Sequence, residues 1–292
     1  MLLDQVKELF LKSLEQKNYS DETIRGYDSN LKDFNAFLTQ RYNTSVYIDE
    51  ITVEDIEAYL QHLAEIRKLQ PKSRNRYLSS ISSMLTFAVK KEWINKNPAM
   101  LVDNAKVIDK PKVSLTGAEI MELANAVDSP IIKTAILFMS TSGLRVNETL
   151  NLKISDLDLT NNIINVVGKG GKYRPVPISQ SLKPILLDYL EEIRNAESEY
   201  LFATEKTGRL SAQYINRELQ LAVKKLGWEK KVSNHTLRRS FATNLYQKGV
   251  SLLAIQKLLG HESLRTTSIY LNVQQSELHE AVNVLKLENK ED

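Results

Sequence analysis

The sequence predicts a mainly helical protein of two domains: an N-terminal helical bundle, and a larger, mostly helical domain of mixed α/β type that contains a small antiparallel sheet. Apolar residues recur at helical spacing through the first hundred positions, a basic stretch with two prolines follows, and one hairpin pattern stands among helical patterns after it. The 292 residues suit two domains of ordinary size. We place these at 1–97 and 113–292, joined by a basic linker at 98–112.

Four amphipathic helices are predicted in the first domain. Ser20 is an N-cap for the second helix, Thr52 with Asp55 resembles a capping box for the third, and Pro71 opens the fourth. The apolar residues at intervals of three and four that define these helices are Val6, Leu9, Phe10 and Leu14; Ile24, Tyr27, Leu31, Phe34, Phe37 and Leu38; Ile56, Tyr59, Leu60 and Leu63; and Tyr77, Leu78, Ile81, Leu85, Phe87 and Val89, running to Trp93.

The second domain begins with a further capping box and contains the only clear β pattern. Thr116 pairs with Glu119, and an apolar helix opens at Pro130 and stops at Gly143. Two β-branched runs then flank a Gly-Lys-Gly-Gly-Lys turn, which indicates a hairpin. The strands are expected at 163–167 and 176–178, and further helices at 182–193, 211–226, 234–248, 251–259 and about 276–287.

Composition excludes several classes of protein and of chemistry. No run approaches the roughly 18 apolar residues of a membrane span, and charges at Asp4, Lys7 and Glu8 do not fit a signal peptide, so a cytoplasmic protein is expected. The chain has no cysteine, which excludes disulfides, thiolate metal sites and cysteine nucleophiles. Any nucleophile must therefore be an oxygen or a nitrogen.

Positive charge is concentrated between residues 66 and 112. The whole chain has a net charge of +3, whereas this segment holds eleven Lys and Arg against three acidic residues, a net charge of +8. Basic residues gathered on one helix and an adjoining linker favour nucleic acid as a partner. A solvated helix face is the ordinary alternative.

Two pairs of polar residues in the second domain are candidates for a site. Arg145 follows the Gly143 helix stop, and Glu148 three residues later can fix its orientation. His235 and Arg238 are also three apart near a helix start, so they can share one face and point at a single anion. Taken alone, each pair is also compatible with a structural ion pair or a chance neighbour on a surface helix.

Two further candidates are a hairpin tip and a histidine with a tyrosine. Lys169 and Lys172 lie among glycines in the turn, where an ammonium group can reach a phosphate, although the spacing is not that of a P-loop. His261 lies in a Leu-Gly-His motif, and Tyr270 follows nine residues later. A solvated hairpin end and a half-buried packing tyrosine are the ordinary alternatives.

In their order and spacing these residues together strongly resemble the tyrosine site-specific recombinase family, also called the phage integrase family, and in particular its compact Xer-like and transposon-encoded members. The resemblance spans nearly the whole chain. It implies a SAM-like core-binding domain followed by a tyrosine-recombinase catalytic domain. The segments that carry it are QPKSRNRYLSSI, TSGLRVNETLNL, VVGKGGKYRPVPI and SNHTLRRSFATNLYQKGVSLLAIQKLLGHESLRTTSIY.

The resemblance also implies a catalytic set and a mechanism. Tyr270 would attack a DNA phosphate, leaving a 3′-phosphotyrosyl link and a free 5′ hydroxyl, while Arg145, Arg238 and His261 neutralise the charge that builds on the non-bridging oxygens. His235 would assist loss of the phenolic proton, and Lys169 would protonate the leaving oxygen. Because the covalent link keeps the bond energy, no ATP or other high-energy cofactor is expected, and because the arginines take the place of a metal clamp, no metal is expected. The matched positions are Arg145, Lys169, His235, Arg238, His261 and Tyr270, with Glu148 where the family usually has an acidic residue.

Partners follow from the same resemblance. The two domains would clamp a double-stranded DNA recombination site, with two recombinases on each of two sites forming a tetramer. The predicted helix at 276–287 is the candidate exchange element between neighbours, and packing on its own domain is the alternative. An accessory protein or a second recombinase stays open. The residues placed for DNA are Lys72, Arg74, Asn75 and Arg76 at the start of the fourth helix, and Lys172, Lys231, Arg239 and Arg265 near the site.

Two other functions stay open at the level of sequence. A type IB topoisomerase shares this chemistry but only relaxes supercoils, and a DNA-binding factor descended from a recombinase would keep the fold without the reaction. The intact catalytic set speaks against the second. The target sequence is not determined, nor is the choice between dimer resolution, cointegrate resolution and integration or excision of an element.

Overall fold

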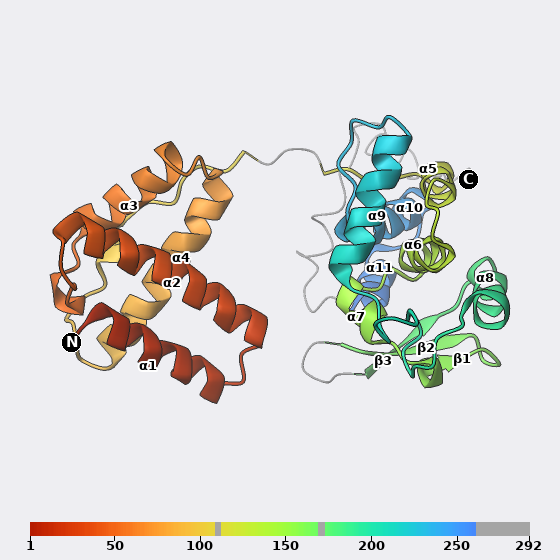
Figure 1. Cartoon of the computed structure of the whole chain (residues 1–292), viewed down its shortest axis with the longest axis horizontal. Helices are drawn as coiled ribbons and strands as arrows, with labels where there is room; N and C mark the ends of the chain where they lie inside the picture. Colours follow the sequence, from red (N-terminus) through yellow and green to blue (C-terminus); the bar gives the residue numbers. More distant parts are fainter. Residues whose placement is uncertain (109–111, 169–172, 261–292) are drawn as a thin grey trace, which may run out of the picture. The chain divides into compact units, whose positions relative to one another are not determined.

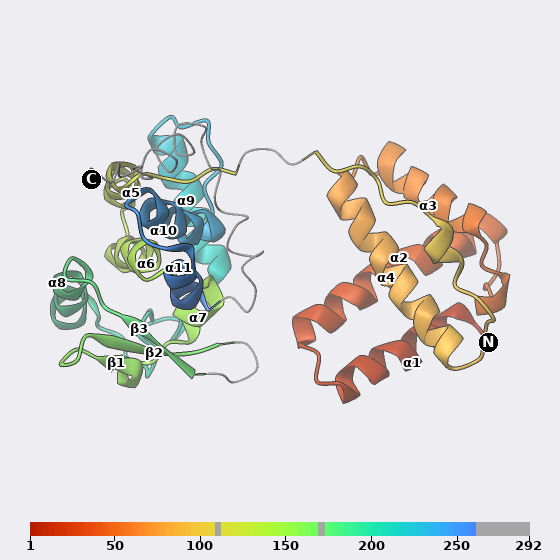
Figure 2. The ribbon, with the colours of Figure 1, turned by 180° about the vertical axis from the view of Figure 1, so that it is seen from behind.

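The structure, a computed structural model, describes residues 1–108, 112–168 and 173–260. The chain forms two units, Met1–Lys110 and Pro111–Asp292, each with its own core (Figures 1 and 2). In the described part of the chain, no helix combines the length and the apolarity needed to cross a membrane.

The described part of the first unit is a bundle of the four predicted α-helices. The Ser20 side chain accepts a hydrogen bond from the backbone N–H of Thr23, and Thr52 and Asp55 form a reciprocal capping box, so both predicted helix starts are confirmed. The elements are α1 (Leu3–Gln16), α2 (Asp21–Tyr42), η1 (Ile48–Glu50), α3 (Val53–Glu65), α4 (Pro71–Lys90) and η2 (Pro98–Leu101), where η1 and η2 are short 3-10 helices.

The core of the first unit largely follows the predicted apolar pattern. Val6, Phe10 and Leu14 lie one helical turn apart and are buried, whereas Leu9 is 41% exposed on the opposite side of α1. Aromatic rings from different helices meet in this core. The ring centroids of Phe34 on α2 and Tyr59 on α3 are 5.1 Å apart.

The beginning of the expected linker belongs to the first unit. Pro98 and Ala99 of η2 are buried, and Asn97 donates a hydrogen bond of 3.0 Å to the backbone carbonyl of Ser82 on α4. The chain therefore leaves the core of this unit later than residue 98, because the 3-10 turn packs its small apolar residues on α4.

The second unit surrounds an apolar central helix, α6. That helix packs against α5, α8 and α10 (Figure 2). It buries residues on nearly every side. Its described elements are α5 (Gly117–Asn125), α6 (Pro130–Ser142), α7 (Val146–Asn151), η3 (Ile154–Asp156), β1 (Leu157–Asp158), β2 (Ile163–Val167), β3 (Tyr173–Pro177), α8 (Leu182–Asp188), η5 (Tyr189–Ile193), α9 (Ala212–Lys225), α10 (Asn234–Gln247) and α11 (Leu252–Leu259).

The predicted hairpin is confirmed, although its second strand covers Tyr173–Pro177 and not 176–178, and it gains a third strand. Strands β2 and β3 pair antiparallel with Ile164 opposite Val176, and the two-residue β1 adds to the other edge of β2. Pro175 is tolerated because β3 is an edge strand of the three. The predicted helix at 182–193 is present, but its second half, η5, is a π-helix. The predicted helix at 276–287 lies outside the described residues.

Candidate active site

A buried carboxylate, Glu148 on α7, forms the centre of the site. Its side chain is 8% exposed and receives hydrogen bonds from two guanidinium groups. Arg145, the N-cap residue of the same helix, donates to it from Nη1 at 2.8 Å and from its backbone N–H at 2.8 Å. Arg174 on β3 binds both carboxylate oxygens, at 3.0 and 2.9 Å. The predicted pairing of Arg145 with Glu148 is therefore present.

The charge state of Glu148 follows from these contacts. Burial acts to raise the pKa of its carboxyl, but the hydrogen bonds and charge of Arg174 and the hydrogen bonds from Arg145 outweigh it, so the pKa lies below its ordinary value. Glu148 is consequently ionised at neutral pH and orients the guanidinium groups around it.

Arg238 is the most buried arginine of this cluster. Its side chain, on α10, is 4% exposed and donates from Nη1 to the Gly143 carbonyl at 2.6 Å and from Nη2 to the Leu259 carbonyl at 2.7 Å. These two carbonyls belong to the ends of α6 and α11, where helix carbonyls lack partners within the helix. Its Nη1 also lies 3.8 Å from Oε2 of Glu148, so one arginine ties three helices to the carboxylate.

The turn that presents Arg145 depends on a glycine. Gly143 ends α6 with φ of +66°, and a Cβ at this position would overlap the ring of Phe241 on α10. The close approach of this ring to the turn holds α10 beside the start of α7. Sequence reasoning identified Gly143 as a helix stop, and the packing on Phe241 appears only in the structure.

Arg174 is the member of the cluster that sequence reasoning missed. On β3 it shares the inward face with Val176, two residues on, and its side chain is only 16% exposed. Alternate residues of a strand face inward, and a charged residue at an inward-facing position needs a buried partner. This pattern was the signal in the sequence that could have identified Arg174. The partner itself is 26 residues away in sequence.

The remaining predicted residues of this unit that the structure describes lie on α10 or just before it. His235 is exposed in the first turn of α10, and Lys231 is exposed before it. Arg239 is half-buried and donates from Nη1 to the backbone carbonyl of Val113 at 2.8 Å. The helix that carries Arg238 therefore also holds the first part of the second unit.

Five of the predicted site residues, including the predicted nucleophile, lie outside the described residues. They are Lys169, Lys172, His261, Arg265 and Tyr270. Gly260, the last described residue before His261, accepts a hydrogen bond of 3.5 Å from Nη2 of Arg145, so the described chain leads directly to the cluster.

In the first unit, the predicted DNA-facing residues differ in how they are engaged. Lys72 and Arg76 are exposed on α4, and the Arg76 guanidinium lies 5.8 Å from the centre of the Tyr77 ring. Asn75 instead pairs with the backbone of Ala105, donating to its carbonyl at 2.9 Å and accepting from its N–H at 2.8 Å. This side-chain amide therefore fixes the residues that follow η2 to α4.

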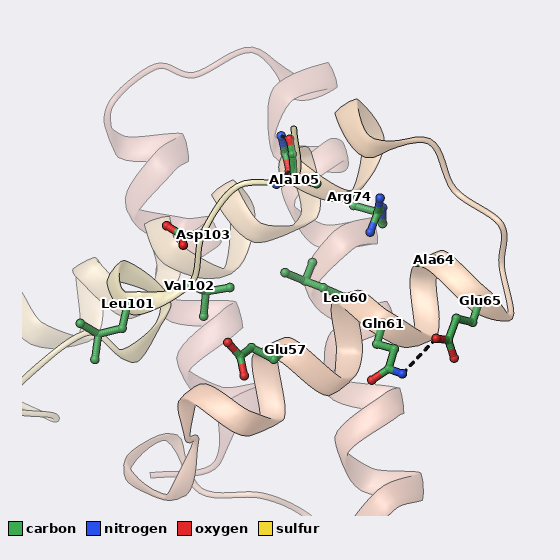
Figure 3. Close-up of a pocket in the computed structure, with 11 residues that line it drawn as sticks. Glu57, Leu60, Gln61, Ala64, Glu65, Arg74, Leu101, Val102, Asp103 and Ala105 are labelled. Atoms are coloured by element: carbon green, nitrogen blue, oxygen red, sulfur yellow. Dashed lines mark hydrogen bonds between the residues drawn. The ribbon is translucent and has the colours of Figure 1, made fainter. Parts of the chain in front are cut away.

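Arg74 lies at a groove between α3 and the segment after η2 (Figure 3). Glu57 and Glu65 line the same groove, and Gln61 donates a hydrogen bond of 3.0 Å to Glu65. Charges of both signs thus meet in the groove, unlike the excess of arginine around Glu148. Among the residues that the structure describes, no group of three His, Asp or Glu side chains is arranged to hold a metal ion.

Three guanidinium groups gathered around one carboxylate carry two positive charges in excess. Arg145 is 41% exposed and Arg238 is almost buried, so the cluster extends from the interior to the surface. Such an arrangement is suited to an anion with several oxygens, and above all to a phosphate.

Comparisons with known proteins match both units. Residues 1–107 match the phage integrase SAM-like domain, and residues 114–277 match the phage integrase family. The chain is 32% identical over 289 residues to tyrosine recombinase XerC of Leptospira interrogans, covering 95% of this chain and 92% of that protein. It is 30% identical over 292 residues to tyrosine recombinase XerD of Staphylococcus aureus, covering 96% and 98%.

The fold is also found among solved structures. A lambda integrase dimer bound to a COC′ core site aligns with a TM-score of 0.79 at 24% identity, over 93% of this chain and 96% of that one. The mainly helical architecture with its small antiparallel sheet, predicted from the sequence, is therefore confirmed.

Proposed function

The chain belongs to the phage integrase family of tyrosine recombinases, and from that membership we propose that it is a site-specific recombinase that cuts and rejoins duplex DNA through a 3′-phosphotyrosyl intermediate. Both curated relatives reported above are named tyrosine recombinases and align over nearly their whole length. In this proposal the SAM-like first unit binds DNA, and the second unit carries out the chemistry.

The observation that best supports this chemistry is the arginine excess around Glu148. Arg145 and Arg238 would bind non-bridging oxygens of one DNA phosphate, and Glu148 would hold Arg145 in place by its two hydrogen bonds. Because Arg238 is fixed by two carbonyls at the ends of α6 and α11, its charge is already in position before DNA arrives. Fixed charge aimed at a developing oxyanion lowers the barrier without reorganisation during the reaction.

The other catalytic roles rest on the family resemblance. Tyr270 would be the nucleophile, His261 a donor to the phosphate, and Lys169 the acid that protonates the departing 5′ oxygen. His235 would accept the phenolic proton, a role that suits its exposed place in the first turn of α10, three residues before Arg238.

DNA binding in this proposal uses both domains. Exposed Lys72 and Arg76, with Arg74 between them on α4, would contact phosphates or a groove, while the Asn75 amide serves the chain itself through Ala105. In the second domain, Lys172, Lys231, Arg239 and Arg265 would contact the backbone near the cut. Solved relatives of the same fold are bound to DNA as a dimer on a core site and as a tetramer on a Holliday junction, which supports self-association on DNA.

Trapping of a covalent adduct tests the proposal. The full chain is incubated with fragmented genomic DNA and denatured in detergent, and DNA that stays attached is sequenced, which also maps the site. Tyr270→Phe should abolish the adduct while leaving DNA affinity nearly unchanged, because only the nucleophilic oxygen is lost. Tyr246→Phe on α10 makes the same change at another tyrosine and should retain the adduct. An adduct that persists in Tyr270→Phe would show that another residue is the nucleophile.

The two alternative functions are separated by a second assay on the mapped site. A plasmid with two copies of the site should yield exchanged products, deletion or inversion, with a recombinase. A type IB topoisomerase would only relax the plasmid, and a DNA-binding factor would give neither adduct nor exchange. The choice of dimer resolution, cointegrate resolution or integration, and any accessory protein, would follow from the identity of the mapped site.

A further inference from the structure

Arg174 occupies the meeting point of three segments that carry the proposed catalytic residues. It is the second residue of β3, directly after the hairpin tip that contains Lys169. Its guanidinium grips both oxygens of Glu148 on α7. It also lies against Gly260, where an added Cβ would be 2.8 Å from Nε and 2.9 Å from Cζ of Arg174. Gly260 is the residue immediately before His261.

The contact with Glu148 is of the strongest kind available to these groups. Two parallel N–H···O bonds of 3.0 and 2.9 Å join a planar guanidinium to a carboxylate that is 8% exposed. Arg145, in comparison, donates one side-chain hydrogen bond to Glu148, and its side chain is 41% exposed. Arg174 therefore balances the buried negative charge to a greater extent than either arginine proposed to bind the phosphate.

We propose that Arg174 is a positioning residue for strand cleavage: by neutralising Glu148 and anchoring the base of the hairpin, it leaves the charges of Arg145 and Arg238 available to the scissile phosphate. This rests on the proposed function. Without Arg174, the buried Glu148 carboxylate would be balanced by Arg145 and by Arg238, whose Nη1 is 3.8 Å away, and the excess charge offered to the phosphate would fall from two to one.

The close approach of Gly260 adds a geometric part to this role. Gly260 ends α11 with φ of +62°, its carbonyl accepts from Arg145, and Arg174 lies close to the side where a Cβ would point. A side chain smaller than arginine at position 174 would leave the Gly260 turn without support on that side. Both parts predict a loss in the rate of cleavage of bound DNA and little loss in DNA affinity.

A double-mutant cycle tests the proposal with the duplex recovered by adduct mapping as the probe. Single-turnover adduct formation and DNA affinity are measured for the unsubstituted protein, Arg174→Gln, Glu148→Gln and the double variant. Arg174→Gln should slow adduct formation by about 10- to 100-fold, the range for groups that orient those touching the reacting atoms, with affinity changed less than about threefold. In the Glu148→Gln background the same substitution should change the rate less than about threefold, because no buried charge remains to be neutralised and only the contact with Gly260 is lost.

Controls keep the outcome decisive. Arg217→Gln removes an arginine from α9 whose side chain is 68% exposed, and it should leave the rate unchanged. If Arg174→Gln does not fold, Arg174→Lys replaces it in the cycle; lysine keeps the charge but cannot grip both oxygens, so a smaller loss of about three- to tenfold is expected. An unchanged rate in the single variant overturns the positioning role, and an equal loss with and without Glu148 overturns its charge-neutralising part. Absence of any adduct with the unsubstituted protein overturns the proposed function as well.

Discussion

At the scale of single residues, Gly143 connects the backbone of the turn to the arginine cluster. Its positive φ ends α6, its carbonyl accepts from Arg238 at 2.6 Å, and the missing side chain admits the ring of Phe241. The residue two positions later is Arg145. The turn at Gly143 thus positions the two arginines proposed to bind the phosphate. At this position the turn has no room for a side chain larger than a hydrogen atom.

Gly143→Ala should therefore destabilise the second unit by about 2–5 kcal/mol, from the strained left-handed backbone together with the overlap of Cβ and the Phe241 ring. Gly249→Ala is the matched control, because Gly249 has φ of +78° but nothing within 4 Å of its added Cβ. It should cost only about 1–2 kcal/mol. Equilibrium unfolding in denaturant measures both, and equal losses would show that Phe241 simply moves aside.

At the scale of elements, α4 and α10 carry candidate functional residues and also bind backbone groups within or just after the linker. On α4, Asn75 clasps the backbone of Ala105 by two hydrogen bonds. On α10, Ser240 accepts from the Leu115 N–H at 2.8 Å, and Asn244 donates to the Leu115 carbonyl at 3.1 Å. The polar side chains between the functional ones therefore satisfy backbone groups of the linker ends, as buried or partly buried backbone groups require.

Because Lys72 and Arg76 are exposed while Asn75 is bonded to Ala105, substitutions of these α4 residues should have different effects on DNA binding. Lys72→Ala and Arg76→Ala should each flatten the slope of log affinity against log salt concentration by about 0.9, the effect of one lost phosphate contact on duplex DNA. Asn75→Ala should leave that slope unchanged, because its amide is engaged with Ala105. Titrations of the mapped duplex at several salt concentrations measure all three. An unchanged slope in the two charge variants would mean that the basic segment is only a solvated face.

At the scale of the whole molecule, positive charge is gathered in two places: the segment at 66–112 and the cluster around Glu148. In the proposed function, the first place supplies affinity for DNA and the second stabilises the transition state. Affinity and rate should therefore respond to different substitutions, since long-range attraction to phosphates is screened by salt while a buried cluster is screened much less.

Cleavage is expected to be independent of divalent metal, because the charge that compensates the phosphate is assigned to Arg145 and Arg238 and the proton to Lys169. Adduct formation on the mapped duplex should keep its rate within about twofold when EDTA is added in excess. Restoration of activity by Mg²⁺ after a loss in EDTA would count against this assignment. The measurement uses the full chain and the same single-turnover assay, so it is directly comparable with the Arg174 cycle.

The sequence by itself determined the helices, the hairpin and the order of the family motifs, because their signals lie within a few residues: caps such as Ser20 and Thr52, the helical period of apolar residues, and the glycine stop at 143. Tertiary structure alone decided which polar residues distant in the sequence meet. Arg174 reaches Glu148 across 26 residues, and Ser240 reaches Leu115 across 125. Such contacts depend on how the elements pack, and no local period in the sequence records a partner that distant.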